Sequence, residues 1–303
     1  MMLAMIENTT QLAGELLHNE PLARYTSWRV GGQAKHFYKP AGVEDLQVYL
    51  ANIAKNEKVV WLGLGSNVLV RDGGIDGSVI YTRGCLNQME FAAAGELYVE
   101  AGVPCAHVAK QSVERGLTGA EFLAGIPGTM GGALAMNAGA FGGETWNLVD
   151  SVLLINRQGD LLERKAADFK IGYRSVMLNE DEWFVAATLK IPVGKDKQGR
   201  DKIRQLLAKR AQTQPTNLPS GGSVFKNPEG DYAARLIEAS ELKGYQIGAA
   251  QVSEKHANFI VNTGGASAAE IEQLILYVQR EVSAQKGILL ETEVRIIGEE
   301  ATI

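Results

Sequence analysis

Cysteine is scarce in this sequence of 303 residues: only Cys85 and Cys105 occur, and neither belongs to a CxxC pair. Two cysteines are too few for the disulfide framework of a small secreted domain, so both are expected to be buried or ordinary thiols. His, Cys, Asp and Glu also do not cluster with the spacing of metal ligands, and no structural or catalytic metal is predicted.

Positive charge and long apolar runs are lacking too. The 30 Lys and Arg against 35 Asp and Glu give a net charge of −5, and basic residues concentrate only at 164–165 and 202–210. Nucleic acid is not an expected partner, because proteins that bind it normally present a basic face. No run approaches the roughly 18 apolar residues of a membrane span. The first seven residues lack the pattern of a signal peptide, so a cytoplasmic protein is expected.

Glycine, by contrast, is in excess, with 34 residues or about 11% of the chain, where roughly 7% is usual. Otherwise the composition, with 46% hydrophobic and 21% charged residues, is that of a globular protein. The length suggests about two domains. The positions of the glycines are therefore more informative than their number.

Hydrophobic patterns predict the elements around the glycines. Helical spacing predicts helices over 44–55, over 201–212 with Ile203, Leu206 and Leu207 on one face, and after a capping box formed by Ser267 and Glu270. Short apolar runs predict strands at 59–62, 78–81, 97–101 and 183–191, and a hairpin around 157–160. The first forty residues are interpreted as a leader segment, and 287–298 as two short extended pieces. A polar stretch at 195–199 predicts a domain boundary.

The first glycine cluster, GLGSNVLV at 63–70, follows a predicted strand. It departs from the dinucleotide-binding fingerprint, because Val68 replaces the third glycine and no clear helix follows. A ring of backbone N–H groups in such a loop binds an anion without needing lysine. A plain strand-loop-strand turn is the alternative.

The second cluster, at 116–143, holds nine glycines in 28 residues. Glycine permits close backbone approach, and Pro127 stiffens the loop. A flexible linker would carry polar residues, whereas here Phe122, Ile126 and Met130 stand among the glycines. The pattern indicates a buried, ordered loop, and a flat cofactor lying against bare backbone is favoured over a purely structural role.

Several motifs together carry a family resemblance. They are GLGSNVLV at 63–70, AGIPGTMGGA at 124–133, MNAGAFG at 136–142, GYRS at 172–175, GSVFKNP at 222–228 and EVR at 293–295. In this order the chain resembles the UDP-N-acetylenolpyruvoylglucosamine reductases, also called UDP-N-acetylmuramate dehydrogenases, from about residue 22 to 298. The interval between Arg174 and Ser223 is too short for the inserted tyrosine loop of longer members, which implies the shorter subtype and leaves open what covers the substrate.

The resemblance implies an α+β fold. An FAD-binding module of the vanillyl-alcohol-oxidase type, made of two α+β subdomains, would be followed by an α+β substrate-binding domain. The implied bounds are an N-terminal segment at 1–20, the FAD-binding domain at 21–194 with subdomains at about 21–80 and 81–194, and the substrate-binding domain at 195–303, whose C-terminal strand returns toward the flavin.

The implied activity is the NADPH-dependent conversion of UDP-N-acetylglucosamine enolpyruvate to UDP-N-acetylmuramate in peptidoglycan precursor synthesis. NADPH would reduce FAD, and the flavin would pass a hydride to the enolpyruvyl group. Non-covalent FAD is expected, since neither glycine cluster contains His or Cys. The alternatives are another FAD-dependent oxidase or dehydrogenase on the same scaffold, against which the motifs at 222–228 and 293–295 argue, and a flavin-free nicotinamide-binding protein.

The same resemblance implies roles for individual residues. The FAD pyrophosphate would lie against Gly63, Gly65, Ser66, Asn67 and Leu69. The flavin would lie near Gly125, Ile126, Pro127, Gly128 and Gly132. Weaker assignments to the diphosphate, sugar or uridine of the substrate are Tyr173, Lys226, Asn227 and His256, of which His256 could equally be structural.

Three further residues would be catalytic: Arg174, Ser223 and Glu293. Hydride addition to an enol ether conjugated with a carboxylate builds enolate-like charge, which needs a nearby cation or acid and a proton donor. Arg174 offers a planar fork to the carboxylate. Glu293 helps only if protonated or bridged by water, which implies a raised pKa. Ser223 would be the proton donor, assisted by Lys226 or Glu293.

Overall fold

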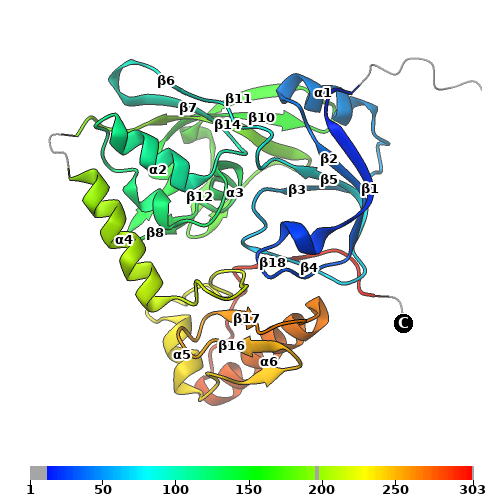
Figure 1. Ribbon diagram of the computed structural model, residues 1–303, viewed down its shortest axis with the longest axis vertical. Coiled ribbons are helices and arrows are strands. Elements are labelled where there is room, and N and C mark those ends of the chain that lie inside the picture. Colours follow the sequence, from blue (N-terminus) through cyan, green and yellow to red (C-terminus); the bar gives the residue numbers. More distant parts are fainter. Residues whose placement is uncertain (1–11, 195–197, 302–303) are drawn as a thin grey trace, which may run out of the picture.

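The computed structural model describes residues 12–194 and 198–301. The first seven residues, which lack a signal-peptide pattern, and residues 195–197 of the polar stretch at 195–199 lie outside the described residues. The described chain forms three parts, two built on larger sheets and one on a small sheet with helices (Figure 1).

The first sheet has the strand order β1-β2-β5-β3. Its strands are β1 (Glu15–Pro21), β2 (Gln33–Lys39), β3 (Val59–Leu62) and β5 (Ile75–Tyr81). The predictions at 59–62 and 78–81 are confirmed, although β5 begins three residues earlier. The interpretation of the first forty residues as a leader was wrong, because β1 and β2 pair antiparallel within this sheet. The side chains of β1 are mostly exposed, so its sequence has no hydrophobic pattern that would predict a strand.

Helix α1 (Val43–Asn52) packs beside this sheet through Leu46, Tyr49 and Leu50, and it ends three residues before the predicted end at 55. Its buried residues share a core cluster with strands of both large sheets. The two sheets therefore form one continuous support.

The second sheet is antiparallel, with the order β11-β10-β14-β7-β6. Its strands are β6 (Met89–Phe91), β7 (Glu96–Glu100), β10 (Val149–Asn156), β11 (Leu161–Lys165) and β14 (Glu182–Lys190). The hairpin around 157–160 is confirmed between β10 and β11, with Gly159 in a left-handed conformation at φ 84°. The strands predicted at 97–101 and 183–191 are shifted by one residue.

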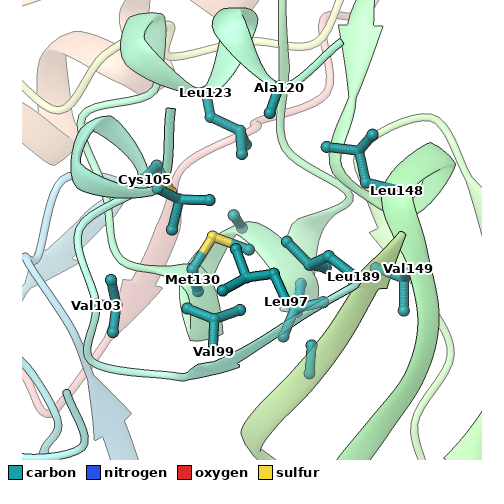
Figure 2. Close-up of a cluster of buried hydrophobic side chains, with 14 of the residues drawn as sticks. Leu97, Val99, Val103, Cys105, Ala120, Leu123, Met130, Leu148, Val149 and Leu189 are labelled. Carbon is teal, nitrogen blue, oxygen red and sulfur yellow. The ribbon is translucent and has the colours of Figure 1, made fainter. Parts of the chain in front are cut away.

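Helix α2 (Cys105–Glu114), the 3₁₀ helix η3 (Glu121–Gly125) and α3 (Met130–Met136) pack on this sheet. Figure 2 shows the shared core, in which Leu97 and Leu189 of the strands meet Met130, Leu123 and Cys105. The apolar residues Phe122, Ile126 and Met130 of the second glycine cluster are buried, as predicted, whereas Phe141 is 41% exposed. The cluster contains η3 and the short helix α3.

Helix α4 (Gly199–Thr213) runs from the part that contains α2 to the last part of the chain (Figure 1). Its Ile203 packs against the core of the second sheet, and Lys202 pairs with Glu121 at 3.4 Å. The prediction of a common apolar face was wrong for Leu207, which is 43% exposed. Ile203 and the Lys202–Glu121 ion pair therefore join the start of this helix to the second sheet and its helices.

The last part comprises α5 (Ala233–Ala239), a small sheet of β15 (Gln246–Ile247), β16 (Ala250–Val252) and β17 (Ile260–Asn262), and α6 (Ala268–Lys286). The predicted capping box is confirmed, since Ser267 accepts a hydrogen bond from the Glu270 backbone and the Glu270 side chain accepts one from Ser267. The predicted stripe of α6 is fully buried, and it consists of Ile271, Leu274, Ile275, Val278 and Val282.

The chain finally returns to the first part. Strand β18 (Arg295–Ile297) pairs in parallel with β4 (Val68–Val70), directly after the first glycine cluster (Figure 1). Of the two extended pieces expected at 287–298, only this one is a strand; the other contributes a single bridge from Thr292 to Phe225. The α+β class is confirmed, while the domain bounds stay a prediction.

Two tight hairpins supply the remaining strands, β8 (Gly139–Ala140) with β9 (Gly143–Glu144), and β12 (Ile171–Gly172) with β13 (Ser175–Val176). Throughout 12–194 and 198–301, no helix is both long and apolar enough to cross a membrane. In the same residues, no group of three or more His, Cys, Asp and Glu is arranged to hold a metal ion.

Candidate active site

A cavity of about 880 Å³ opens where the three parts meet. This volume lies in the range of ligand pockets. Twelve of the seventeen residues predicted for the site line it: Gly63, Gly65, Ser66, Asn67, Gly125, Ile126, Pro127, Gly128, Gly132, Arg174, Ser223 and Glu293. Residues far apart in the sequence therefore share one ligand-sized space.

The loop after β3 needs glycine for packing. A Cβ on Gly63 would lie 2.2 Å from Thr129 Oγ1, and a Cβ on Gly65 would lie 2.1 Å from the Tyr25 backbone oxygen. Gly65 also has φ +63°, a conformation that favours glycine. The strand β4 follows this loop where a dinucleotide-binding fold would have a helix.

The second glycine cluster presents bare backbone to the cavity. Among the described residues, no atom lies within 4 Å of a Cβ built on Gly132, and a Cβ on Gly128 would come no closer than 3.6 Å, to Ser66 Oγ. Between them, the buried Thr129 hydroxyl has no hydrogen-bond partner within the described chain. An unpartnered buried hydroxyl beside open backbone calls for a polar ligand. These features fit an elongated cofactor such as FAD.

Arg174 and Glu293 form an ion pair at the cavity. Arg174 Nε donates to Glu293 Oε1 at 3.0 Å, and Arg174 Nη2 donates to the Gly139 backbone oxygen at 3.0 Å. Arg174 occupies the turn between β12 and β13 with φ +54°, which is uncommon for a non-glycine residue. Two side-chain contacts and a tight hairpin thus fix the direction of its guanidinium.

The pKa of the Glu293 carboxyl is raised above its ordinary value. Burial is the largest cause, while Arg174 and, at longer range, Lys226 oppose part of the shift. Burial disfavours the charged carboxylate more than the neighbouring cations favour it. A neutral carboxyl therefore stays accessible at higher pH than for an exposed glutamate.

Ser223 is tied to Glu293 through the main chain. The Glu293 backbone N–H donates to the Val224 oxygen at 2.8 Å, and Val224 is the residue after Ser223. The Lys226 N–H donates to the Glu291 oxygen at 2.9 Å. The serine segment and the segment before β18 therefore run side by side, which places both predicted catalytic residues on one wall.

Two predicted residues lie elsewhere for clear reasons. Leu69 is fully buried in the core, because alternation along β4 turns Val68 toward the cavity and Leu69 away from it. Asn227 is used locally, since its Oδ1 accepts a hydrogen bond from the backbone N–H of Ala233, the first residue of α5, at 3.1 Å. Neither side chain lines the cavity.

Tyr173, Lys226 and His256 also lie outside the cavity lining. Tyr173 is 48% exposed beside the guanidinium of Arg174. Lys226 Nζ pairs with Glu291 at 3.2 Å. The His256 ring contacts Phe259, which does line the cavity, and burial lowers the pKa of His256. A neutral imidazole is a weak partner for a diphosphate.

Sequence reasoning missed several lining residues, among them Arg210, Gln214, Phe141 and Arg295. Arg210 is half-buried at the end of α4, and its Nε donates to Gln214 Oε1 at 3.1 Å. Arg210 belongs to the basic stretch at 202–210, for which the sequence predicts a helix and no site. Helical spacing predicts the helix but does not predict which part of the fold its last turn contacts.

Two protein families match parts of the chain. Residues 34–164 match the family "FAD binding domain", and residues 214–297 match "UDP-N-acetylenolpyruvoylglucosamine reductase, C-terminal domain". The protein named UDP-N-acetylenolpyruvoylglucosamine reductase from Methylococcus capsulatus is 58% identical to this chain, and the match covers 94% of both chains. The protein of the same name from Legionella pneumophila strain Corby is 54% identical, and the match covers 96% of this chain and 95% of that one. The crystal structure of such a reductase from Thermus caldophilus has a TM-score of 0.80 at 30% identity, covering 93% of this chain and 98% of that one.

Proposed function

The chain belongs to the UDP-N-acetylenolpyruvoylglucosamine reductase family, and we propose that it reduces UDP-N-acetylglucosamine enolpyruvate to UDP-N-acetylmuramate with FAD and NADPH. It is an FAD-dependent oxidoreductase. One observation carries the assignment of the reaction: the Arg174–Glu293 pair and the Ser223 loop lie on the same cavity as both glycine clusters. A cytoplasmic location remains part of this proposal.

The two glycine clusters would hold the cofactor. Backbone N–H groups of the loop that contains Gly63 to Asn67 suit an anionic pyrophosphate, and the open backbone at Gly128 and Gly132 suits a flat ring. When bound, FAD supplies a hydride carrier between NADPH and the enolpyruvyl group. Groups of this chain would bind the substrate, stabilise its developing charge and deliver the proton.

Arg174 and Glu293 would stabilise the negative charge that develops on the substrate carboxylate. The guanidinium is held by the Gly139 oxygen as well as by Glu293, so it needs little reorganisation when the charge forms. The raised pKa of Glu293 favours a neutral carboxyl that donates a hydrogen bond. Such a donor adds to the attraction from Arg174 without adding repulsion.

Ser223 would deliver the proton to the carbon next to the new C–H bond. A serine hydroxyl is a weak acid, so its oxygen must receive help as the proton leaves. Glu293 is held close by the hydrogen bond between its N–H and the Val224 oxygen. Arg210, the half-buried cation on the same cavity, suits the substrate diphosphate.

The test is a spectroscopic titration with product analysis. The purified protein should show flavin absorption that bleaches with NADPH and returns when UDP-N-acetylglucosamine enolpyruvate is added under anaerobic conditions, with UDP-N-acetylmuramate as the product. FAD should be released on denaturation. Turnover of a simple alcohol with oxygen, and no reaction with the sugar nucleotide, would show instead an oxidase on the same scaffold.

A further inference from the structure

A short segment near the N-terminus, Thr26 to Trp28, contacts both walls of the active site. The Ser27 N–H donates to the Gly65 oxygen at 3.0 Å, and Ser27 Oγ lies 3.2 Å from the same oxygen. Ser27 Oγ also donates to the Ser220 oxygen at 2.7 Å. One serine therefore connects the proposed FAD loop to the segment that leads to Ser223.

Trp28 packs against the segment that leads to Ser223. A Cβ on Gly221 would lie 2.4 Å from the Trp28 ring, so the indole packs directly against the Gly221 backbone. Trp28 is fully buried, and its Nε1 donates to the Ile260 oxygen at 2.8 Å. Asn262 Nδ2 donates to the Trp28 oxygen at 3.0 Å. One hydrogen bond holds the indole ring and another holds the Trp28 backbone, so the ring has a fixed position against Gly221.

Thr26 fixes the turn that presents these two residues. Its Oγ1 donates to the Val30 oxygen at 2.8 Å, and the side chain is 5% exposed. The Gly65 backbone lies against the same turn, since its Cβ would be 2.8 Å from Thr26 Cα. The segment Thr26 to Trp28 thus separates the two walls, and it packs against Gly65 of one wall and Gly221 of the other.

We propose that Ser27 and Trp28 are positioning residues that set the distance between the FAD loop and the hydroxyl of Ser223. The proposal rests on the role of Ser223 given above. Hydride and proton must reach adjacent carbons of one substrate, so the two walls need a fixed separation. A displacement of about 1 Å at such a site can lower a rate by about 100-fold.

The test separates the two half-reactions in anaerobic stopped-flow measurements. Ser27→Ala and Trp28→Phe should keep FAD reduction by NADPH within about two-fold of the wild type. Reoxidation by UDP-N-acetylglucosamine enolpyruvate should fall by about ten-fold or more, with a larger solvent deuterium isotope effect because proton delivery becomes slower than hydride transfer. Ser27→Thr, which keeps the hydroxyl, should restore most of the reoxidation rate.

Two controls remove side chains of the same kind elsewhere. Ser240→Ala deletes a buried hydroxyl that donates to the Leu236 oxygen, and Trp146→Phe deletes a buried indole N–H that donates to the Leu134 oxygen. Both should lower stability while both half-reactions keep their rates. Should Trp28→Phe fail to fold, Ser27→Ala decides alone.

Equal effects on both half-reactions, or none in Ser27→Ala, would overturn the proposal. A failure of the function itself looks different: the wild-type protein would not be reoxidised by the sugar nucleotide, or Ser223→Ala would be reoxidised at the wild-type rate.

Discussion

Asn67 holds Glu293 in place: its Nδ2 donates a hydrogen bond to the Glu293 backbone oxygen at 2.9 Å. The two residues are 226 positions apart, and the neighbouring Arg295 N–H returns a bond to the Asn67 oxygen at 3.0 Å. The first glycine cluster and Glu293 are therefore joined in one structural unit.

Asn67→Ala should lower the free energy of unfolding by about 1 to 3 kcal/mol, because it leaves the partly buried Glu293 oxygen without this donor. Denaturant titration of the apoprotein measures the change. As a control, Asn52→Ala removes an exposed hydrogen bond from the side-chain amide to the Val48 oxygen. This variant should change the free energy of unfolding by less than about 0.5 kcal/mol. Equal losses in the two variants would contradict the structural role of Asn67.

Glu293→Gln should remove a pH dependence from flavin reoxidation. The protonated carboxyl is the proposed functional form, so the wild-type rate should fall as pH rises through the raised pKa of Glu293. Glutamine does not titrate, and its profile should be flat. Single-turnover reoxidation across pH checks this, with Glu291→Gln as the exposed control. An unchanged profile in Glu293→Gln would assign the titration to another group.

Ser223→Ala should leave flavin reduction by NADPH nearly intact and slow reoxidation by at least about 100-fold, because general acid catalysis contributes roughly 100 to 10,000-fold. Stopped-flow absorbance at the flavin band separates the two steps. Similar losses in both steps would point to a disturbed cavity and away from a proton donor.

Two adjacent glycines of α3 should behave in opposite ways. A methyl group on Gly131 would lie 2.8 Å from Ala101 Cβ, so Gly131→Ala should destabilise the apoprotein by about 1 to 3 kcal/mol. The methyl group of Gly132→Ala meets no atom of the part of the chain that the structure describes within 4 Å, and the substitution should stabilise the helix by up to about 1 kcal/mol.

Gly132→Ala should also change the affinity for FAD. The methyl group of Gly132→Ala projects into the cavity, so FAD affinity should fall even though the apoprotein is more stable. Thermal unfolding of the apoprotein and FAD titration measure the two effects. FAD affinity equal to the wild type would remove Gly132 from the cofactor site.

Cys105 should not react with a thiol reagent in the native protein. Burial raises its pKa to about 12, so almost no thiolate exists at pH 8, and its side chain is fully covered. Cys85→Ser, which leaves Cys105 as the sole cysteine, should release no thiol colour with Ellman's reagent until urea is added. Reaction under native conditions would show that the core around α2 opens.

The sequence alone predicted most of the elements and the family. The stripe of α6, the capping box at Ser267, the turn at Gly159 and the strand at 59–62 depend on local periodicity and capping, which short segments contain in full. Motif order identified residues of all three parts of the cavity, and twelve of them line it.

Tertiary structure decided the rest. The edge strand β1 carries exposed residues, so its pairing with β2 supplies what its own pattern lacks. Arg210 lines the cavity because of where α4 ends. Leu69 lies in the core because the pairing of β4 with β18 fixes which face of β4 it occupies. The contacts of Ser27 and Trp28 cross 193 and 232 positions. Such contacts arise from packing between distant segments, and no local pattern in the chain encodes them.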